Sequence, residues 1–252
     1  MTGLPWRLLA DAPAPGAWNM AADEAMLEAM AAGVVGPTLR LYGWEPACLS
    51  LGRNQALPNG LAERAALLGI DVVRRPTGGQ AVLHAAEITY SVVTEAGTRG
   101  VLGDYRHLNG ILARALAEVG FPADLIRTEA SGQRGEASCF ARPGRADLAV
   151  AGHKIGGSAQ VRRGGLLLQH GSIKLWPASV RLADVLGPGT PEPVALWSNA
   201  PLEAPEACRS SLERALAHAF GLAWHPEART SWEHAWIATH RPREGSLSAA
   251  GT

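Results

Sequence analysis

A strand that ends in two arginines leads into a glycine turn in the stretch Arg74-Arg75-Pro76-Thr77-Gly78-Gly79-Gln80-Ala81-Val82-Leu83-His84. The predicted strand covers Asp71–Arg75, and His84 lies on the next predicted strand. Glycine has no Cβ, so the backbone N–H groups of such a turn can approach a ligand closely. The stretch therefore suits an anionic or carbonyl-bearing ligand. The alternative is an ordinary hairpin with surface arginines, because Gly-Gly turns are common.

A second glycine-rich stretch lies downstream, Gly152-His153-Lys154-Ile155-Gly156-Gly157-Ser158-Ala159-Gln160. Lys154 alternates with Ile155 on a predicted strand, and only small residues follow them. Small residues beside a lysine leave room for a ligand chain or for another backbone. A glycine-rich bulge is the equally weighted alternative. Farther on, His170 stands in the stretch Gln169-His170-Gly171-Ser172-Ile173, where it could reach a ligand or be structural.

Lysine is rare in this chain, which has 21 arginines and two lysines, Lys154 and Lys174. A GC-rich genome favours arginine codons and accounts for the bias. The two lysines that remain are candidates for a specific role, because an ammonium is a compact charge that can lose a proton, whereas the guanidinium of arginine cannot.

Residues 128–145 are polar, glycine- and arginine-rich, and weakly periodic, which predicts a long loop carrying Cys139. A lone cysteine is most often a small buried hydrophobe. Nearby arginines favour a thiolate at Cys139 and lower the thiol pKa from its usual value of about 8.5. Cys48 and Cys208 lie in an apolar strand and a helix, and both are predicted to pack.

The order of predicted elements mixes hairpin-like strand pairs with helices, which favours an α+β fold over a doubly wound one. Asn19 is expected to cap a helix over Met20–Ala32. The apolar runs Thr38–Trp44 and Ala47–Leu51 predict two strands joined by a tight turn at Glu45-Pro46. We expect a mixed, largely antiparallel sheet flanked by helices.

Composition excludes several classes of protein. The chain has 252 residues, 47% hydrophobic, and a formal net charge of zero, which fits one large globular domain and no general nucleic-acid or polybasic membrane surface. No apolar run reaches the length of about 18 residues that a spanning helix needs, and no signal peptide is recognised. Three cysteines without a CxxC pair predict neither a disulfide framework nor a metal site, and favour the cytoplasm.

Together the motifs resemble the biotin/lipoate protein ligase and octanoyltransferase superfamily. The resemblance extends from Trp6 to Trp176 and rests on WNMAADEAML, LYGWEPACLSLGRNQ, RRPTGGQAVLH followed by ITYSV, GHKIGGSAQ and LQHGSI. The SCF that contains Cys139, about fifteen residues before Lys154, is similar to the LipM-type octanoyltransferases. Lipoate–protein ligases have the lysine but generally lack this cysteine.

The resemblance implies an acyltransferase with the lipoate-ligase and biotin-ligase catalytic fold. It would move an octanoyl group from octanoyl-acyl carrier protein to a lysine of a lipoyl domain, with the glycine-cleavage H protein as the expected acceptor. The donor thioester is already activated, so no ATP or other cofactor is implied. We also expect a catalytic domain over residues 1–205, a short helical extension over residues 206–252 that packs on it, and a monomeric protein.

The resemblance assigns roles to individual residues. Cys139 matches the acyl-thioester nucleophile, and Lys154 matches the invariant lysine that lowers its pKa and binds the oxyanion. The small residues Gly156, Gly157, Ser158 and Ala159 would shape an acyl tunnel. The carbonyl end would be lined by Arg75, Thr77, Gly78, Gly79 and His84, and His170 is a further candidate ligand contact. The family motif often has an acid where Ala85 stands, and without it His84 is not expected to be an oriented acid or base.

Other functions remain open at this point. An ATP-dependent lipoate–protein ligase would need a nucleotide site, and Cys139 would have no role in adenylation. An octanoyl amidotransferase between lipoyl domains would also use a cysteine. A non-catalytic module that holds an acyl group would leave Cys139 incidental. A DNA-binding regulator is disfavoured because the motifs begin almost at the N-terminus.

Overall fold

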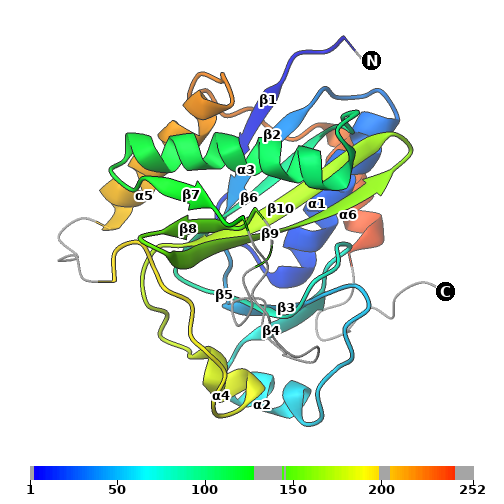
Figure 1. Ribbon diagram of the computed structural model, residues 1–252. Coiled ribbons are helices and arrows are strands. Elements are labelled where there is room, and N and C mark those ends of the chain that lie inside the picture. Colours follow the sequence, from blue (N-terminus) through cyan, green and yellow to red (C-terminus); the bar gives the residue numbers. More distant parts are fainter. Residues whose placement is uncertain (1–2, 128–143, 145, 199–204, 242–252) are drawn as a thin grey trace.

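Two sheets at an angle to each other organise the computed structural model, which describes residues 3–127, 144, 146–198 and 205–241 (Figure 1). The larger, seven-stranded sheet has the strand order β1-β2-β6-β10-β9-β8-β7. Its strands are β1 Arg7–Ala10, β2 Thr38–Tyr42, β6 Glu87–Glu95, β10 Leu166–Lys174, β9 His153–Arg163, β8 Leu148–Val150 and β7 Ala123–Leu125. Only β1 and β2 pair in parallel, and the other neighbours are antiparallel.

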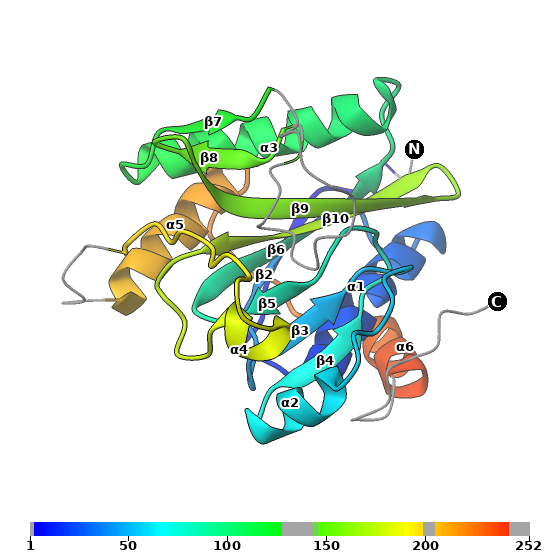
Figure 2. The ribbon, with the colours of Figure 1, turned by 60° about the horizontal axis from the view of Figure 1, so that its bottom comes forward.

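The small sheet has three strands in the order β4-β3-β5, and it lies beside β6 and β10 (Figure 2). Its strands are β4 Asp71–Arg74, β3 Cys48–Leu51 and β5 Val82–His84. Two short helices, α2 Leu61–Leu67 and α4 Leu182–Leu186, pack their apolar side chains against it. The loop between β4 and β5 therefore connects the two edge strands of the small sheet, which lie on either side of β3, and its Thr77 contacts His170 of the large sheet.

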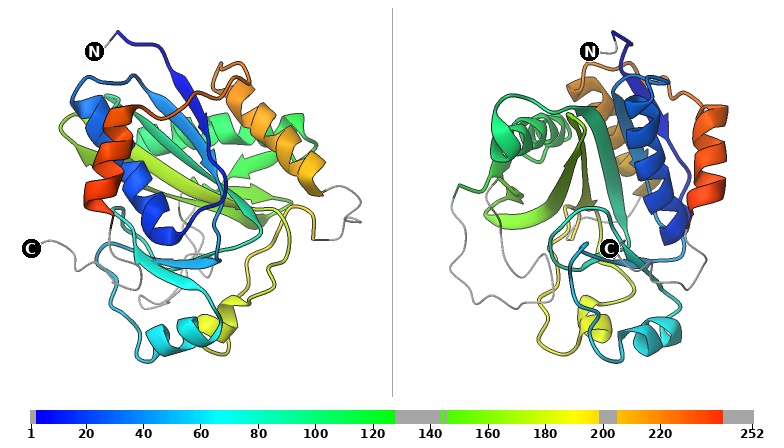
Figure 3. Two further views of the ribbon diagram at one scale, coloured as in Figure 1. Left: turned by 180° about the vertical axis from the view of Figure 1, so that it is seen from behind. Right: turned by 90° about the vertical axis from the view of Figure 1, so that its right-hand side faces the viewer.

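Four longer helices cover the two faces of the large sheet (Figure 3). These are α3 Gly100–Glu118 and α5 Pro205–Ala219 on one face, and α1 Gly16–Ala31 on the other, where α6 Ser231–His240 packs on the outer side of α1 (Figure 3). In α3 the buried apolar residues recur at three- and four-residue spacing, as a helix packed on one side requires: Leu108, Ile111, Leu112, Ala115 and Leu116. No described helix is long and apolar enough to cross a membrane.

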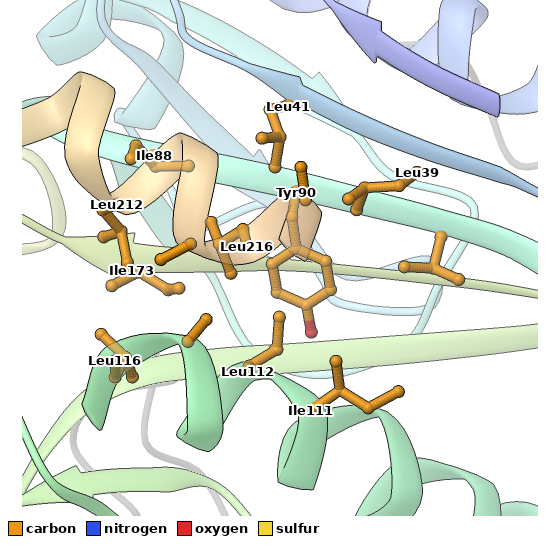
Figure 4. Close-up of a cluster of buried hydrophobic side chains, with 14 of the residues drawn as sticks. Leu39, Leu41, Ile88, Tyr90, Ile111, Leu112, Leu116, Ile173, Leu212 and Leu216 are labelled. Atoms are coloured by element: carbon orange, nitrogen blue, oxygen red, sulfur yellow. The ribbon is translucent and has the colours of Figure 1, made fainter. Parts of the chain in front are cut away.

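The main hydrophobic core lies between the large sheet and the α3–α5 face (Figure 4). Tyr90 of β6 points from the sheet toward Leu112 of α3, while Leu212 and Leu216 of α5 cover the same surface. Tyr90 is 1% exposed, and its hydroxyl hydrogen-bonds Ser158 Oγ at 2.6 Å. Burying each methylene of this core stabilises the fold by about 0.8 kcal/mol. The packed core therefore supports the face of the sheet opposite α1.

The predicted α+β class and the largely antiparallel sheet are confirmed. Helix α5 packs on α3 through the main core, and α6 packs on α1. The division into residues 1–205 and 206–252 stays a prediction. The predicted loop over 128–145, with Cys139, lies almost entirely outside the described residues.

The two strands expected in Thr38–Trp44 and Ala47–Leu51 are present as β2 and β3, but they do not pair with each other as a hairpin. Strand β2 pairs with β1 and β6, whereas β3 pairs with β4 and β5 of the small sheet. Every residue of both strands is buried. Because both faces of each strand are buried, no solvent-exposed face is available to indicate from the sequence which strand it pairs with.

Asn19 also differs from its predicted role. Helix α1 begins at Gly16, so Asn19 lies inside it and does not cap it. Its amide donates to the carbonyls of Ala14 and Gly43, and its Oδ1 accepts from Arg40 at 2.6 Å. The side chain thus stabilises a buried arginine from β2, a partner 21 residues away.

Candidate functional site

An apolar cavity lies between the small sheet and the large sheet, with about 440 Å³ of empty space within it and at its mouth. Its walls come from α1, β2, β3, β5, the β4–β5 loop, β6, β9 and β10. It is lined by Met20, Tyr42, Trp44, Ser50, Arg75, Gly79, Val82, His84, Thr89, Gly157, Ser158, Ala159, His170, Gly171 and Ser172. Its lining is mainly apolar with a few polar side chains, as is usual for small-ligand pockets.

Arg75 organises the glycine loop from within. It is 5% exposed, and its guanidinium donates to the carbonyls of Ser50, Gly78 and Gln80 at 2.7–3.2 Å. The alternative of a hairpin with a surface arginine is therefore wrong for Arg75. Gly79 has φ +96, a conformation that favours glycine.

The same loop packs tightly on the end of β3. A Cβ placed on Gly52 would lie 1.8 Å from the carbonyl oxygen of Gly79. The two backbones can approach this closely only because position 52 has no side chain. This contact fixes the loop against the small sheet.

His84 is held between a hydroxyl and a carboxylate. Its Nδ1 lies 2.7 Å from Glu87 Oε1, and its Nε2 lies 2.7 Å from Ser50 Oγ. Burial lowers the pKa of His84, although Glu87 acts in the opposite direction, so the ring is neutral at neutral pH. Nδ1 then donates to Glu87, and Ser50 donates to Nε2. Trp44 stacks on the ring with centroids 4.1 Å apart.

The expectation that His84 lacks an orienting acid is therefore wrong. Ala85 has no carboxylate at the motif position, but Glu87 at the start of β6 supplies one to His84. Burial on its own would raise the pKa of Glu87, yet Lys174 and His84 lower it well below its usual range. Glu87 is thus an acceptor for His84, Thr89 and Ser172.

His170 has the same kind of arrangement on the opposite wall. Its Nδ1 lies 3.0 Å from Asp23 Oδ2, and its Nε2 lies 2.7 Å from Thr77 Oγ1. Burial would raise the pKa of Asp23, but the Arg40 guanidinium and the hydrogen bond from His170 lower it to about 2. His170 therefore donates to an ionised carboxylate and also contacts the glycine loop.

Lys154 lies near the start of β9 and is 8% exposed. Its Nζ forms an ion pair with Asp147 Oδ2 at 2.7 Å. The other oxygen of Asp147 accepts from the Tyr105 hydroxyl at 3.0 Å. Burial raises the pKa of Tyr105 well above its usual range, so this phenol remains a donor. Asp147 and Tyr105 together fix the position of the lysine.

The structure brings most of the predicted site residues together. Those that line the cavity are Arg75, Gly79, His84, Gly157, Ser158, Ala159 and His170. Thr77 does not line it but hydrogen-bonds His170, which does. Gly78 is the loop residue whose carbonyl Arg75 holds, and Gly156 is buried on β9 beside β10. Lys154 lies two residues before Gly156 on that strand. Cys139 lies outside the described residues.

Four polar residues of the site were not singled out from the sequence: Ser50, Glu87, Asp147 and Asp23. Ser50 and Asp23 lie in segments that carried the family resemblance, which was the only available signal. Asp147 immediately precedes the strand that pairs with β9, so a hairpin register places it near Lys154. Among the described residues, no group of His, Cys, Asp and Glu is arranged to hold a metal ion.

Comparison with known proteins agrees with this geometry. Over 180 residues the chain is 43% identical to an "Octanoyltransferase LipM" of Kyrpidia tusciae, covering 68% of this chain and 66% of that protein. It is also 43% identical over 180 residues to a protein of the same name from Symbiobacterium thermophilum, covering 68% and 65%. The matched region thus spans about two thirds of the length of these relatives.

Solved structures share the fold. A lipoate-protein ligase A bound with ATP superimposes with a TM-score of 0.75 at 20% identity, covering 98% of this chain and all of that one. A bi-partite lipoate protein ligase from Thermoplasma acidophilum superimposes with a TM-score of 0.70 at 18% identity, covering 98% and 96%. The model of the lipoyl protein ligase A/B catalytic domain family matches residues 15–195, which include both glycine-rich stretches and both histidines of the cavity. The chain therefore belongs to the lipoyl protein ligase A/B catalytic domain family.

Proposed function

We propose that this chain is an octanoyltransferase of lipoate biosynthesis. It takes an octanoyl group from octanoyl-acyl carrier protein and transfers it to a lysine of a lipoyl domain, with the glycine-cleavage H protein as the expected acceptor. The observation that carries the proposal is an apolar cavity walled by the glycine loop and by β9, the strand that also holds buried Lys154. Relatives at 43% identity that are named octanoyltransferases support it.

The dimensions suit a medium-length acyl chain. Lys154 precedes the cavity-lining residues Gly157–Ala159 by three to five positions on one strand. At about 3.3 Å per residue this is roughly 10–16 Å along the strand. A thioester near Lys154 would place an extended acyl tail in the cavity, where each buried methylene contributes about 0.8 kcal/mol.

Two thioester steps complete the proposed route. The Cys139 thiolate attacks the donor carbonyl, the new C–S bond forms, and the carrier thiolate leaves. Lys154 stabilises the negative charge that develops on the carbonyl oxygen. The acceptor lysine, as a neutral amine, then attacks the acyl-cysteine. An amide bond forms, the cysteine leaves as a thiolate, and the proton lost by the amine goes to solvent.

The ion pair with Asp147 gives Lys154 a defined position for this role. A compact ammonium fits beside the small residues of β9, whereas a guanidinium is broader and planar. Two further parts of the proposal rest on the sequence alone: action as a monomer, and a cytoplasmic location.

A transfer assay tests the proposal against the alternatives. Purified chain is mixed with a lipoyl domain and either octanoyl-acyl carrier protein without ATP, or octanoic acid with ATP. The mass of the lipoyl domain is then measured. We expect octanoylation in the first mixture only. Acylation in the second mixture only would make the chain a ligase.

Two further mixtures complete the assay. Transfer from an octanoylated H protein, but not from the carrier protein, would make the chain an amidotransferase. Acyl binding without transfer from any donor would make it a binding module. Cys208→Ser is the matched control for Cys139→Ser, because Cys208 lies on α5, which contributes nothing to the described cavity.

A further inference from the structure

We propose that Lys174 is a positioning residue of the cavity: by neutralising Glu87, it lets that carboxylate orient His84 without drawing a proton onto the ring. The cavity wall then stays ordered and uncharged. The inference rests on the proposed function only in taking the cavity as the acyl site. It also gives a role to Lys174, the second of the two lysines in the chain.

The contacts form one continuous chain of polar groups. Lys174 Nζ contacts Glu87 Oε2 and donates to the carbonyl of Leu83. The other oxygen of Glu87 lies 2.7 Å from His84 Nδ1, and His84 Nε2 lies 2.7 Å from Ser50 Oγ. Lys174, Glu87, His84 and Ser50 are all buried, so water does not screen these charges.

The opposite wall repeats this order of groups. Arg40 Nη1 pairs with Asp23 Oδ1 at 2.6 Å, and Asp23 Oδ2 accepts from His170. The other ring nitrogen of His170 meets the hydroxyl of Thr77. Each cavity histidine therefore follows the sequence cation, carboxylate, imidazole, hydroxyl. Its occurrence twice around one cavity points to a shared requirement for ordered histidine rings.

The charges facing His84 determine what Lys174 does. Glu87 on β6 favours a protonated ring, while Lys174 on β10 and Arg75 in the β4–β5 loop oppose it. Ser50 on β3 and Trp44 contribute a hydroxyl and an aromatic face. Cys48, the register partner of His84 on β3, has its pKa raised by burial and stays a neutral thiol. Without Lys174, the unbalanced Glu87 would favour an imidazolium.

An imidazolium at this position would disfavour an apolar chain. A charge buried beside hydrocarbon loses its hydration, and only Glu87 would compensate it. An uncharged ring stacked under Trp44 presents an apolar face instead. Lys174 thus keeps the wall suited to an unsubstituted acyl tail while Glu87 fixes the ring orientation.

The test is the titration of His84 by NMR of its ring nitrogens in the full chain, assigned with His84→Gln. In the unmodified chain we expect the His84 midpoint to lie below the usual histidine value, because burial lowers the pKa of the ring. In Lys174→Met we expect the His84 midpoint to move upward, together with a loss of octanoyl transfer as the pH falls through that midpoint. An unmoved midpoint would overturn the inference.

Two variants separate this effect from a loss of folding. Lys174→Met/Glu87→Gln removes both charges, and we expect it to return His84 to a neutral ring and a flat pH profile. Arg7→Met breaks another buried ion pair, Arg7–Glu233 at 2.6 Å, and should leave the His84 titration unchanged. A raised midpoint in the double variant would also contradict the inference. The titration is independent of catalysis, so failure of the proposed function would not change it.

Discussion

Thr77 and His170 are 93 positions apart in the sequence, yet Thr77 Oγ1 lies 2.7 Å from His170 Nε2. Thr77 belongs to the glycine loop of the small sheet, and His170 belongs to β10 of the large sheet. This hydrogen bond therefore joins the two sheets across the cavity. Asp23 holds the other side of the ring, so the loop position depends on α1 as well.

Removing that hydroxyl should loosen the cavity. Thr77→Val keeps the shape of the side chain but leaves His170 Nε2 buried without this partner, which costs about 1–3 kcal/mol of stability. We expect a lower urea midpoint and a raised KM for octanoyl-acyl carrier protein. Thr239→Val is the control, because the Thr239 hydroxyl is exposed on α6 and bonds only local groups. Equal KM values for the two variants would contradict the role of Thr77.

The close approach of Gly52 to Gly79 makes a second prediction. Gly52→Ala would force the Gly79 carbonyl to move, because the added Cβ would lie 1.8 Å from its oxygen. Such overpacking costs about 1–3 kcal/mol and shifts the loop. We expect reduced transfer with weaker acyl binding, measured by steady-state kinetics. Gly110→Ala has open space around it on α3 and should raise stability by about 0.5–1 kcal/mol without affecting transfer.

Octanoyl transfer should depend on the shape of the Lys154 side chain as well as on its charge. Lys154→Arg retains a cation beside Asp147, but the planar guanidinium no longer places a compact donor at the carbonyl. Loss of one such donor typically reduces the rate by about 10²–10³. We expect a loss of that order in kcat with little change in stability. A fully active Lys154→Arg enzyme would show that charge alone is sufficient.

Asp23 should make the protein sensitive to acid. Its pKa in the fold is about 2, below the ordinary value of 3.8, so the ionised form is the one that the fold stabilises. The contribution is fully present above the unfolded pKa and is lost as the pH falls through the folded one. A shift of this size corresponds to about 2 kcal/mol. When the pH is lowered from about 4 to about 2, the urea midpoint of unfolding should therefore fall less for Asp23→Asn than for the parent protein.

Much of the fold and part of the site could be predicted from the sequence. The order of predicted strands and helices indicated the α+β class, and turn residues located the glycine loop. These signals are local. The partner of β3 could not be predicted, because all of its residues are buried and no solvent-exposed face indicates how it pairs.

The polar chains of the cavity show the same limit. His84 and His170 stand in recognisable stretches, but each polar chain also needs a group that is distant in the sequence. Asp23 lies 147 positions from His170. Glu87 is only three residues from His84, but Lys174 lies 87 positions from Glu87. Contacts at such separation depend on how the sheets assemble, so the orientation of His170 and the pairing of Glu87 with a lysine could not be assigned before the fold was known.

The central claim is that Cys139 carries the octanoyl group as a thioester. The most direct measurement is the intact mass of the protein after mixing with octanoyl-acyl carrier protein, without ATP and without an acceptor. We predict an octanoyl adduct that hydroxylamine removes, that Cys139→Ser lacks and that Cys208→Ser retains. The account would be contradicted by an unmodified mass in a preparation that still octanoylates a lipoyl domain.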